Sequence, residues 1–151
     1  GDPSSRADLA RTRLEALAGE GVWEPDPGVW ALLDDAENAS PPDGVAVCHG
    51  DLHVRHLMVG EDGAAAGVID WGDTCLADPA IDLALAYAGF DGAARAALLK
   101  AYGRPVPPER ELTARVLAVF VSAALAQYAA AEGPRALLTE ALNGITRAAR
   151  P

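Results

Sequence analysis

The sequence predicts a mainly helical α+β fold that carries a small β-hairpin element near its centre. Apolar residues recur at helical spacing in the first and last parts of the chain. Between them, short apolar runs alternate with turns rich in glycine and aspartate, a pattern typical of short strands. With 151 residues, 50% of them hydrophobic, the chain can bury one ordinary core. We therefore expect one domain over residues 1–151, formed by a helical lead-in, a loop-rich centre and a helical subdomain (1–44, 45–78 and 79–151).

The lead-in is predicted to form two helices followed by a loop. The first helix covers residues 5–19, where a serine can cap the start and a glycine ends the helix. The second covers residues 27–38 and directs valine, tryptophan and leucine side chains towards a core. Proline, serine, aspartate and glycine in residues 39–44 indicate a loop that leads into the centre of the chain.

The centre is predicted to form a strand, a loop, a hairpin and a second loop. We expect strands at its three apolar runs (45–48, 57–59 and 64–69). Residues 74–78 are predicted to be loop. Asp51, His56 and Asp70 lie near the ends of these strands, so we expect their side chains to point into one pocket.

Helices account for the remainder of the chain (80–88, 93–102, 109–132 and 134–149). The longest apolar candidate, residues 116–131, is interrupted by Ser122 and Gln127. No run of about 18 apolar residues exists, so we expect no membrane-spanning segment. The first residues lack the apolar core of a signal peptide, which favours a cytoplasmic location.

The charge balance of the chain is strongly acidic. Aspartate and glutamate number 22 against 12 lysines and arginines, which gives a net charge of −10 at neutral pH. This charge argues against a nucleic-acid backbone as partner. It suits a cationic small molecule, although acidity also serves solubility.

Three linked motifs stand in the centre of the chain: HGDLHVRH, GVIDWGD and DPAIDLA (49–56, 67–73 and 78–84). In this order they resemble the catalytic lobe of the aminoglycoside and macrolide phosphotransferases, small-molecule relatives of the protein kinases. The resemblance covers about 40 residues. It implies the large, carboxyl-terminal lobe of a protein-kinase-like fold. The implied reaction moves the γ-phosphate of ATP or GTP to a hydroxyl of a small molecule, an aminoglycoside- or macrolide-type antibiotic.

The resemblance also implies a role for five residues of these motifs. Asp51 would be the catalytic base that orients the acceptor hydroxyl and receives its proton. Asp70 and His56 would bind Mg²⁺, with Mn²⁺ as an alternative ion because imidazole is a poor ligand for magnesium. His49 would pack under the catalytic loop, and Asp82 would bond the backbone of the HGD turn as a supporting residue.

The chain lacks two parts that a kinase needs. It contains no GxGxxG loop, and its one lysine, Lys100, lies in a predicted helix after the motifs. Both parts belong to the amino-terminal nucleotide lobe of a kinase-like protein. We therefore expect this chain to be the carboxyl-terminal part of a longer protein and to be inactive without that lobe.

Several positions stay open from the sequence alone. Asp73 is a weak candidate for contact with a cationic substrate, and a solvated loop acid is the plainer interpretation. His53 and Arg55 have no assigned role. The acceptor pocket is expected among the later helices, where three acids are candidates (Glu111, Glu132 and Glu140).

Two other functions compete with the kinase interpretation. The HGDLH cluster could hold zinc in a metal-dependent hydrolase, although the order of its ligands is unusual for that class. A lobe without its nucleotide partner could instead be a non-catalytic module that binds a small molecule or a protein. Cys48 and Cys75 show neither zinc-like spacing nor a disulfide framework, so we expect reduced, packed thiols.

Overall fold

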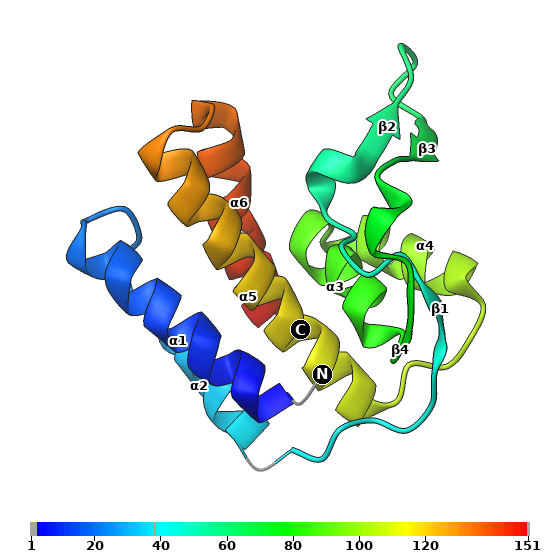
Figure 1. Ribbon diagram of the computed structural model, residues 1–151, viewed down its shortest axis with the longest axis horizontal. Helices are drawn as coiled ribbons and strands as arrows, with labels where there is room; N and C mark the ends of the chain where they lie inside the picture. The colour runs from blue at the N-terminus through cyan, green and yellow to red at the C-terminus, as the bar shows by residue number, and fades with distance from the viewer. Residues whose placement is uncertain (1–2, 38, 151) are drawn as a thin grey trace.

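The computed structural model describes residues 3–37 and 39–150 (Figure 1). Its helices are α1 Pro3–Gly19, α2 Pro27–Glu37, α3 Ala80–Gly89, α4 Gly92–Tyr102, α5 Pro108–Ala131 and α6 Arg135–Ala149. Its strands are β1 Ala46–Cys48, β2 Leu57–Val59, β3 Ala65–Val68 and β4 Cys75–Ala77, and short 3₁₀ helices form at η1 Val54–His56 and η2 Trp71–Asp73. The predicted helices agree with these bounds within two residues. Asn38, the predicted end of the second helix, lies outside the described residues.

Helix α5 is the centre of the helical core. It packs against α1, α2, α3 and α6, which surround it (Figure 1). Its Val116 and Val119 are completely buried, together with Leu14 of α1 and Ile145 of α6. Small and branched side chains alternate along α5, so four helices can approach it closely and exclude water from its apolar face.

One glycine sets the approach of α6 to α5. A Cβ atom added to Gly144 would lie 2.6 Å from the Ser122 hydroxyl and 3.3 Å from the Ala88 carbonyl oxygen. Any larger residue at this position would push α6 away from α3 and α5.

Helix α5 is also long and apolar enough to cross a membrane, as judged by length and composition. Half of its most apolar 18-residue window is buried against other helices. A core helix passes the same test, and the packing of α5 is that of a core helix.

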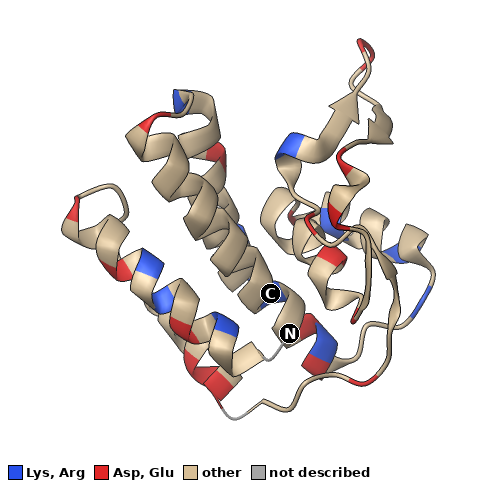
Figure 2. Cartoon of the chain, viewed as in Figure 1, with Lys and Arg blue, Asp and Glu red and all other residues tan. Residues whose placement is uncertain are grey.

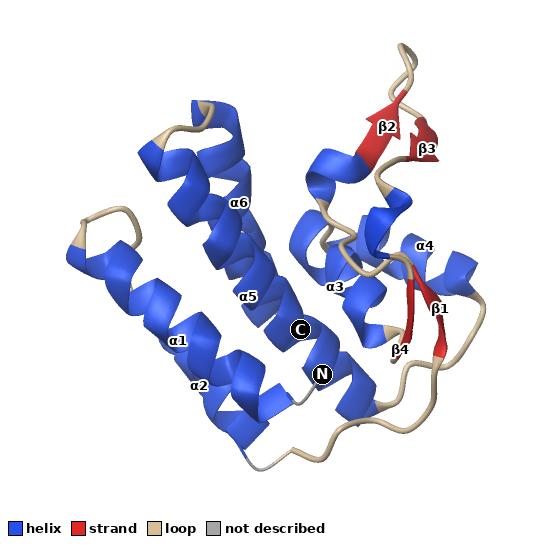
Figure 3. Ribbon diagram, in the orientation of Figure 1, coloured by secondary structure: helices blue, strands red, loops and turns tan. Residues whose placement is uncertain are grey.

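The strands form two small antiparallel sheets at one side of the molecule (Figure 3). The predicted hairpin is present as β2 and β3, with a register irregularity between Met58 and Val59. The prediction of loop over residues 74–78 was wrong, because β4 pairs with β1 there and sets Cys48 opposite Cys75. A strand of three residues shows no periodicity, and its partner lies far away in the sequence, so the local pattern could not reveal it.

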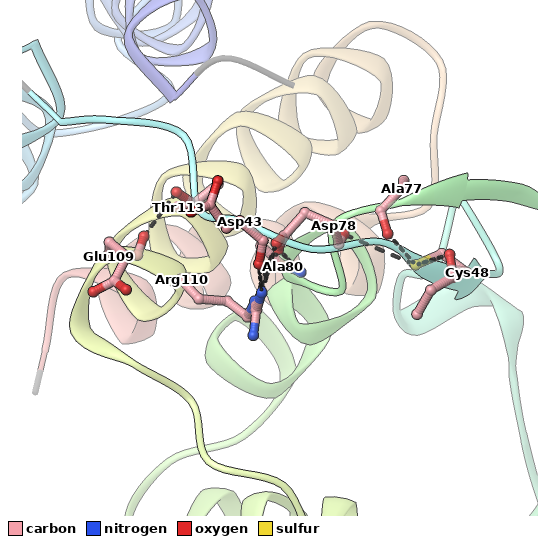
Figure 4. Close-up of polar contacts among 9 residues, drawn as sticks. Asp43, Cys48, Ala77, Asp78, Ala80, Glu109, Arg110 and Thr113 are labelled. Atoms are coloured by element: carbon pink, nitrogen blue, oxygen red, sulfur yellow. Dashed lines mark hydrogen bonds and ion pairs between the residues drawn. The ribbon is translucent and has the colours of Figure 1, made fainter.

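A polar cluster fastens the strand region to the helices (Figure 4). Arg110 of α5 donates to both carboxylate oxygens of Asp78, at 2.9–3.1 Å, and to the backbone carbonyl of Asp43 at 2.6 Å. Asp78 also accepts the backbone N–H of Ala80 at 2.7 Å, at the start of α3. One arginine therefore ties α5 to the entry of β1 and the exit of β4.

Candidate active site

The HGD turn has a backbone conformation that its neighbours enforce. Gly50 has φ +90°, and a Cβ atom there would overlap the carbonyl oxygen of Asp73. The Asp82 carboxylate accepts two backbone N–H groups, from His49 at 2.7 Å and from Gly50 at 3.1 Å. Helix α3 thus holds the turn that presents Asp51.

His49 joins this turn to the strand that precedes Asp70. Its side chain is buried, with 2% of the residue exposed. The Asp51 N–H donates to Nδ1 of His49 at 3.3 Å, so the ring proton is on Nε2, which donates to the Ile69 carbonyl at 2.9 Å. The ring also packs against Trp71, with centroids 4.8 Å apart. The His49 imidazole therefore links the HGD turn to the residues on either side of Asp70.

His56 and Asp70 lie side by side. The Nδ1–H of His56 donates to the backbone carbonyl of Asp51 at 2.8 Å, which leaves the lone pair on Nε2. That Nε2 lies 3.5 Å from Asp70 Oδ2. Asp70 has left-handed backbone angles, φ 65° and ψ 56°, which are unfavourable for a residue other than glycine. Trp71 helps to keep Asp70 in this conformation, because its indole N–H donates to the carbonyl of Val68, two residues before Asp70.

This pair suits a divalent cation. Two neighbouring ligands of a six-coordinate ion with bonds of 2.0–2.1 Å lie about 3 Å apart, close to the spacing of His56 Nε2 and Asp70 Oδ2. The Asp70 side chain is 68% exposed, so it can reach an ion without crossing packed atoms. The residues therefore fit the magnesium or manganese ion that the motifs imply.

His53, which the sequence left unassigned, lies between Asp51 and His56. Its Nε2 is 3.7 Å from Asp51 Oδ2, and its ring stacks on His56 with centroids 3.9 Å apart. Burial, followed by the neighbouring His56, lowers the pKa of His53 below its ordinary value. Its Nδ1 is buried without a hydrogen-bond partner.

Three ligand atoms from Asp51, His53 and His56 lie within 4.8 Å of one another. A metal ion must lie near the plane of each imidazole that binds it, whereas the two rings are stacked with an angle of 29° between their planes. The ligands of a tetrahedral zinc ion converge on it from separate directions, whereas these two rings stack face to face. The described arrangement of His53 and His56 is therefore not that of an assembled zinc centre.

A cleft of about 380 Å³ opens beside Asp51. Its lining comes from α1, from the loop of residues 51–55 and from α5. We call it the Asp51 cleft and define it by nine residues: Arg13, Asp51, His53, Arg55, Phe120, Val121, Ala124, Leu125 and Tyr128. Sequence reasoning missed Arg13 and Tyr128, because nothing in the spacing of residues links α1 or the end of α5 to the HGD turn.

The other sequence candidates lie elsewhere. Asp73 is exposed at the end of η2. Glu111 lines a different hollow together with Arg115 and α2 residues, and Glu140 pairs with Arg147. Glu132 is exposed just beyond the end of α5. None of these acids lines the Asp51 cleft.

The two cysteines differ in exposure. Cys48 is buried, as expected for a packed thiol, and its Sγ lies 3.5 Å from the carbonyl oxygens of Ala46 and Ala77. Cys75 is exposed, so the expectation of a packed thiol was wrong there. Both thiols are free.

Comparisons with known proteins place the chain in a family. The sequence profile of the "Phosphotransferase enzyme family" matches residues 1–115. Over 66 residues the chain is 35% identical to the uncharacterized protein YcbJ of Bacillus subtilis (strain 168), a match that covers 44% of this chain and 22% of that protein. Among solved structures, a macrolide 2'-phosphotransferase type I superposes with a TM-score of 0.53 at 26% identity, over 96% of this chain and 49% of that one. The macrolide 2'-phosphotransferase MphH from Brachybacterium faecium, an apoenzyme, superposes with a TM-score of 0.47 at 28% identity. That match covers 96% of this chain and 50% of that one.

The chain therefore spans about half the length of the solved structures that it matches. The predicted fold class is confirmed: a mainly helical, kinase-like lobe with a small β-hairpin. The resemblance drawn from the three motifs is confirmed as well, since the family profile covers most of the chain, including the HGD turn, Asp70 and Asp82. This chain belongs to the phosphotransferase enzyme family.

Proposed function

We propose that the chain is the large lobe of a small-molecule kinase that transfers the γ-phosphate of ATP or GTP to a hydroxyl group. One observation carries the proposal. A pair of ion-binding side chains, His56 and Asp70, lies 3.5 Å apart on the segment whose Asp51 opens onto a cleft, in a chain of a phosphotransferase family. Phosphoryl transfer needs this combination of positioned acceptor, cation and carboxylate.

Asp51 is the proposed base. Its carboxylate is half exposed and faces the Asp51 cleft, where an acceptor hydroxyl can donate to it. The HGD turn fixes its backbone through Asp82 and His49, so the carboxylate keeps its place while the acceptor binds. A carboxylate in this place orients the hydroxyl and receives its proton as the new bond to phosphorus forms.

Asp70 Oδ2 and His56 Nε2 are the proposed ligands of Mg²⁺, or of Mn²⁺. A cation bound there would neutralise charge on the nucleotide phosphates. The hydrogen bond from His56 Nδ1 to the Asp51 carbonyl keeps the other ring nitrogen free for the ion.

We further propose that an amino-terminal lobe of the same protein completes the enzyme and that the chain alone is inactive. Val47 of β1 and Leu76 of β4 are each 73% exposed, and Met58, Val59 and Trp71 add apolar surface on the same side of the molecule. Isolated domains seldom expose so many large apolar side chains together. A nucleotide lobe would cover them, which agrees with a chain half as long as its solved neighbours. A cytoplasmic location, with ATP or GTP available, is part of the proposal.

For the acceptor, the names of the solved neighbours offer a macrolide, and the wider resemblance offers an aminoglycoside. The direct test incubates the full-length protein with ATP or GTP, Mg²⁺ and cationic, neutral and anionic hydroxyl compounds, macrolides and aminoglycosides among them, and follows phosphate transfer by ³¹P NMR. Transfer that depends on Asp51 and Asp70, and survives Asp8→Asn on the exposed face of α1, supports the proposal. Absence of transfer with every acceptor and both nucleotides contradicts it.

A non-catalytic binding lobe is the second candidate, and the exposed apolar side of the sheets favours it. The two candidates differ in their response to manganese. A kinase lobe binds Mn²⁺ at the His56–Asp70 pair, and the paramagnetic ion then broadens the His56 ring resonances in the wild type but not in Asp70→Asn. Broadening that is equal in both proteins removes the pair from the function.

A further inference from the structure

The charges that line the Asp51 cleft are opposite in sign to those of the chain as a whole. The chain carries a net charge of −10. The cleft, by contrast, is lined by two arginines and one aspartate, and that aspartate is the proposed base. Figure 2 shows basic segments on α1 and just before β2, the elements that contribute these arginines. The lining residues of this cleft therefore carry a net positive charge.

The two arginines are not neutralised by acids of the protein. Arg13 donates to the Gln127 side-chain oxygen at 2.7 Å, and its guanidinium lies 5.1 Å from the centre of the Phe120 ring. Arg55 is exposed and lies 5.5 Å from the centre of the Tyr128 ring. Within residues 3–37 and 39–150, neither forms an ion pair, whereas other arginines of the chain pair with carboxylates (Arg11, Arg110 and Arg147).

The acids that would attract a polycation lie outside the cleft. Glu140 is paired with Arg147 and lines a neighbouring hollow that shares His53, Val121 and Leu125 with the cleft, and Glu111 lines another hollow. Among the residues that line the cleft, a polycationic acceptor would meet one opposing charge, Asp51, and two arginines that repel it.

We propose that the acceptor of this cleft is a hydroxyl compound with an apolar ring and an anionic oxygen group. Arg13 and Arg55 bind the anionic group, and the apolar ring contacts the aliphatic lining of Val121, Ala124 and Leu125. This proposal rests on the proposed function, since it names the class of acceptor that Asp51 serves. The planar guanidinium matches carboxylate and phosphate groups with two parallel N–H donors.

The test uses four nitrophenyl glycosides that share the ring and differ in charge. They are the glucuronide, the glucoside 6-phosphate, the neutral glucoside and the 2-amino-2-deoxyglucoside, which keep the hydroxyls at C3 and C4 and differ at C6 or C2. Titration calorimetry of the full-length protein should give an affinity at least about tenfold higher for an anionic probe than for the amino probe. The better of the two anionic probes identifies the group as carboxylate or phosphate. The preference should shrink in high salt, as expected for partly exposed charges.

Two variants test whether Arg13 and Arg55 cause the preference for anionic probes. Arg55→Gln and the double variant Arg13→Gln/Arg55→Gln should abolish it, while Arg104→Gln, an exposed arginine beside a different hollow, should leave it unchanged. Circular dichroism checks that each variant is folded. Tighter binding of the amino probe, of a polycationic aminoglycoside or of a macrolide overturns the proposal, as does no binding of any probe. An anionic preference that survives the double variant also overturns it.

The two proposals can fail separately. If the binding assay shows a preference for anions but the full-length protein transfers no phosphate, the anion-binding proposal is supported and the kinase proposal is contradicted. Transfer that depends on Asp51 but goes to cationic acceptors leaves the kinase function intact and defeats the charge proposal.

Discussion

Replacement of Arg110 by methionine should destabilise the fold strongly. Methionine keeps the packing of the aliphatic stem but leaves the Asp78 carboxylate with a single partner, the Ala80 N–H. The Arg110 and Asp78 side chains are only 15% and 12% exposed, so their attraction is poorly screened by water. The same attraction raises the pKa of the Arg110 guanidinium above its ordinary value. Exposed pairs contribute up to about 1 kcal/mol, and breaking a buried pair costs about 3–5 kcal/mol.

We expect Arg110→Met to lower the free energy of unfolding by about 3 kcal/mol, and Tm by roughly 6–12 °C for a chain of this size. Urea unfolding and a thermal scan followed by circular dichroism measure both quantities. Arg104→Met, at an exposed arginine without an ion pair in the described part of the chain, is the matched control. Adding Asp78→Asn to Arg110→Met should recover part of the loss, because no buried charge then lacks a partner. A loss for Arg110→Met no larger than that of the control would refute the reasoning.

Three further predictions concern the candidate site. Gly50→Ala should lower the free energy of unfolding by about 2 kcal/mol or more, because the added Cβ overlaps a backbone carbonyl at a positive φ. The control Gly67→Ala, at a position with open space, should change the free energy of unfolding by less than about 0.5 kcal/mol. Equal urea midpoints for the two variants would contradict this prediction. Asp70→Gly should raise stability by about 0.5–1 kcal/mol by relieving the left-handed backbone, yet abolish turnover of the full-length protein; a lower Tm would show that the backbone is not strained. Burial raises the pKa of the Cys48 thiol, so less thiolate is present at any pH near 8. A thiol-disulfide reagent at that pH should label Cys75 quickly and Cys48 only after unfolding, and two equal rates would disprove the difference.

The helices and the hairpin could be predicted because their signals are local. Apolar spacing, glycine stops and proline starts placed all six helices, and the glycine-rich turn placed β2 and β3. The same locality explains the missed strand β4. Its three residues acquire strand geometry only by pairing with β1, and that pairing is a tertiary contact.

In the candidate site, too, residues within one motif could be predicted, and residues brought together from distant elements could not. The motifs predicted that Asp51, His56 and Asp70 point into one pocket. His56 and Asp70 do lie 3.5 Å apart, but the cleft beside Asp51 is lined by neither of them. The acceptor side could not be predicted. It brings Arg13 from α1 and Tyr128 from α5 to a loop far from both in sequence.

The most direct test of the central claim is the turnover of the full-length protein with Asp51→Asn. Asparagine keeps the size of the side chain and the backbone bonds of the HGD turn, but it cannot accept the proton of the acceptor hydroxyl. The account predicts a fall in kcat of about 10²–10⁴-fold, with Tm within about 2 °C of the wild type and the His56 response to Mn²⁺ unchanged. Unchanged turnover would show that Asp51 is not the base and that the reaction takes place elsewhere.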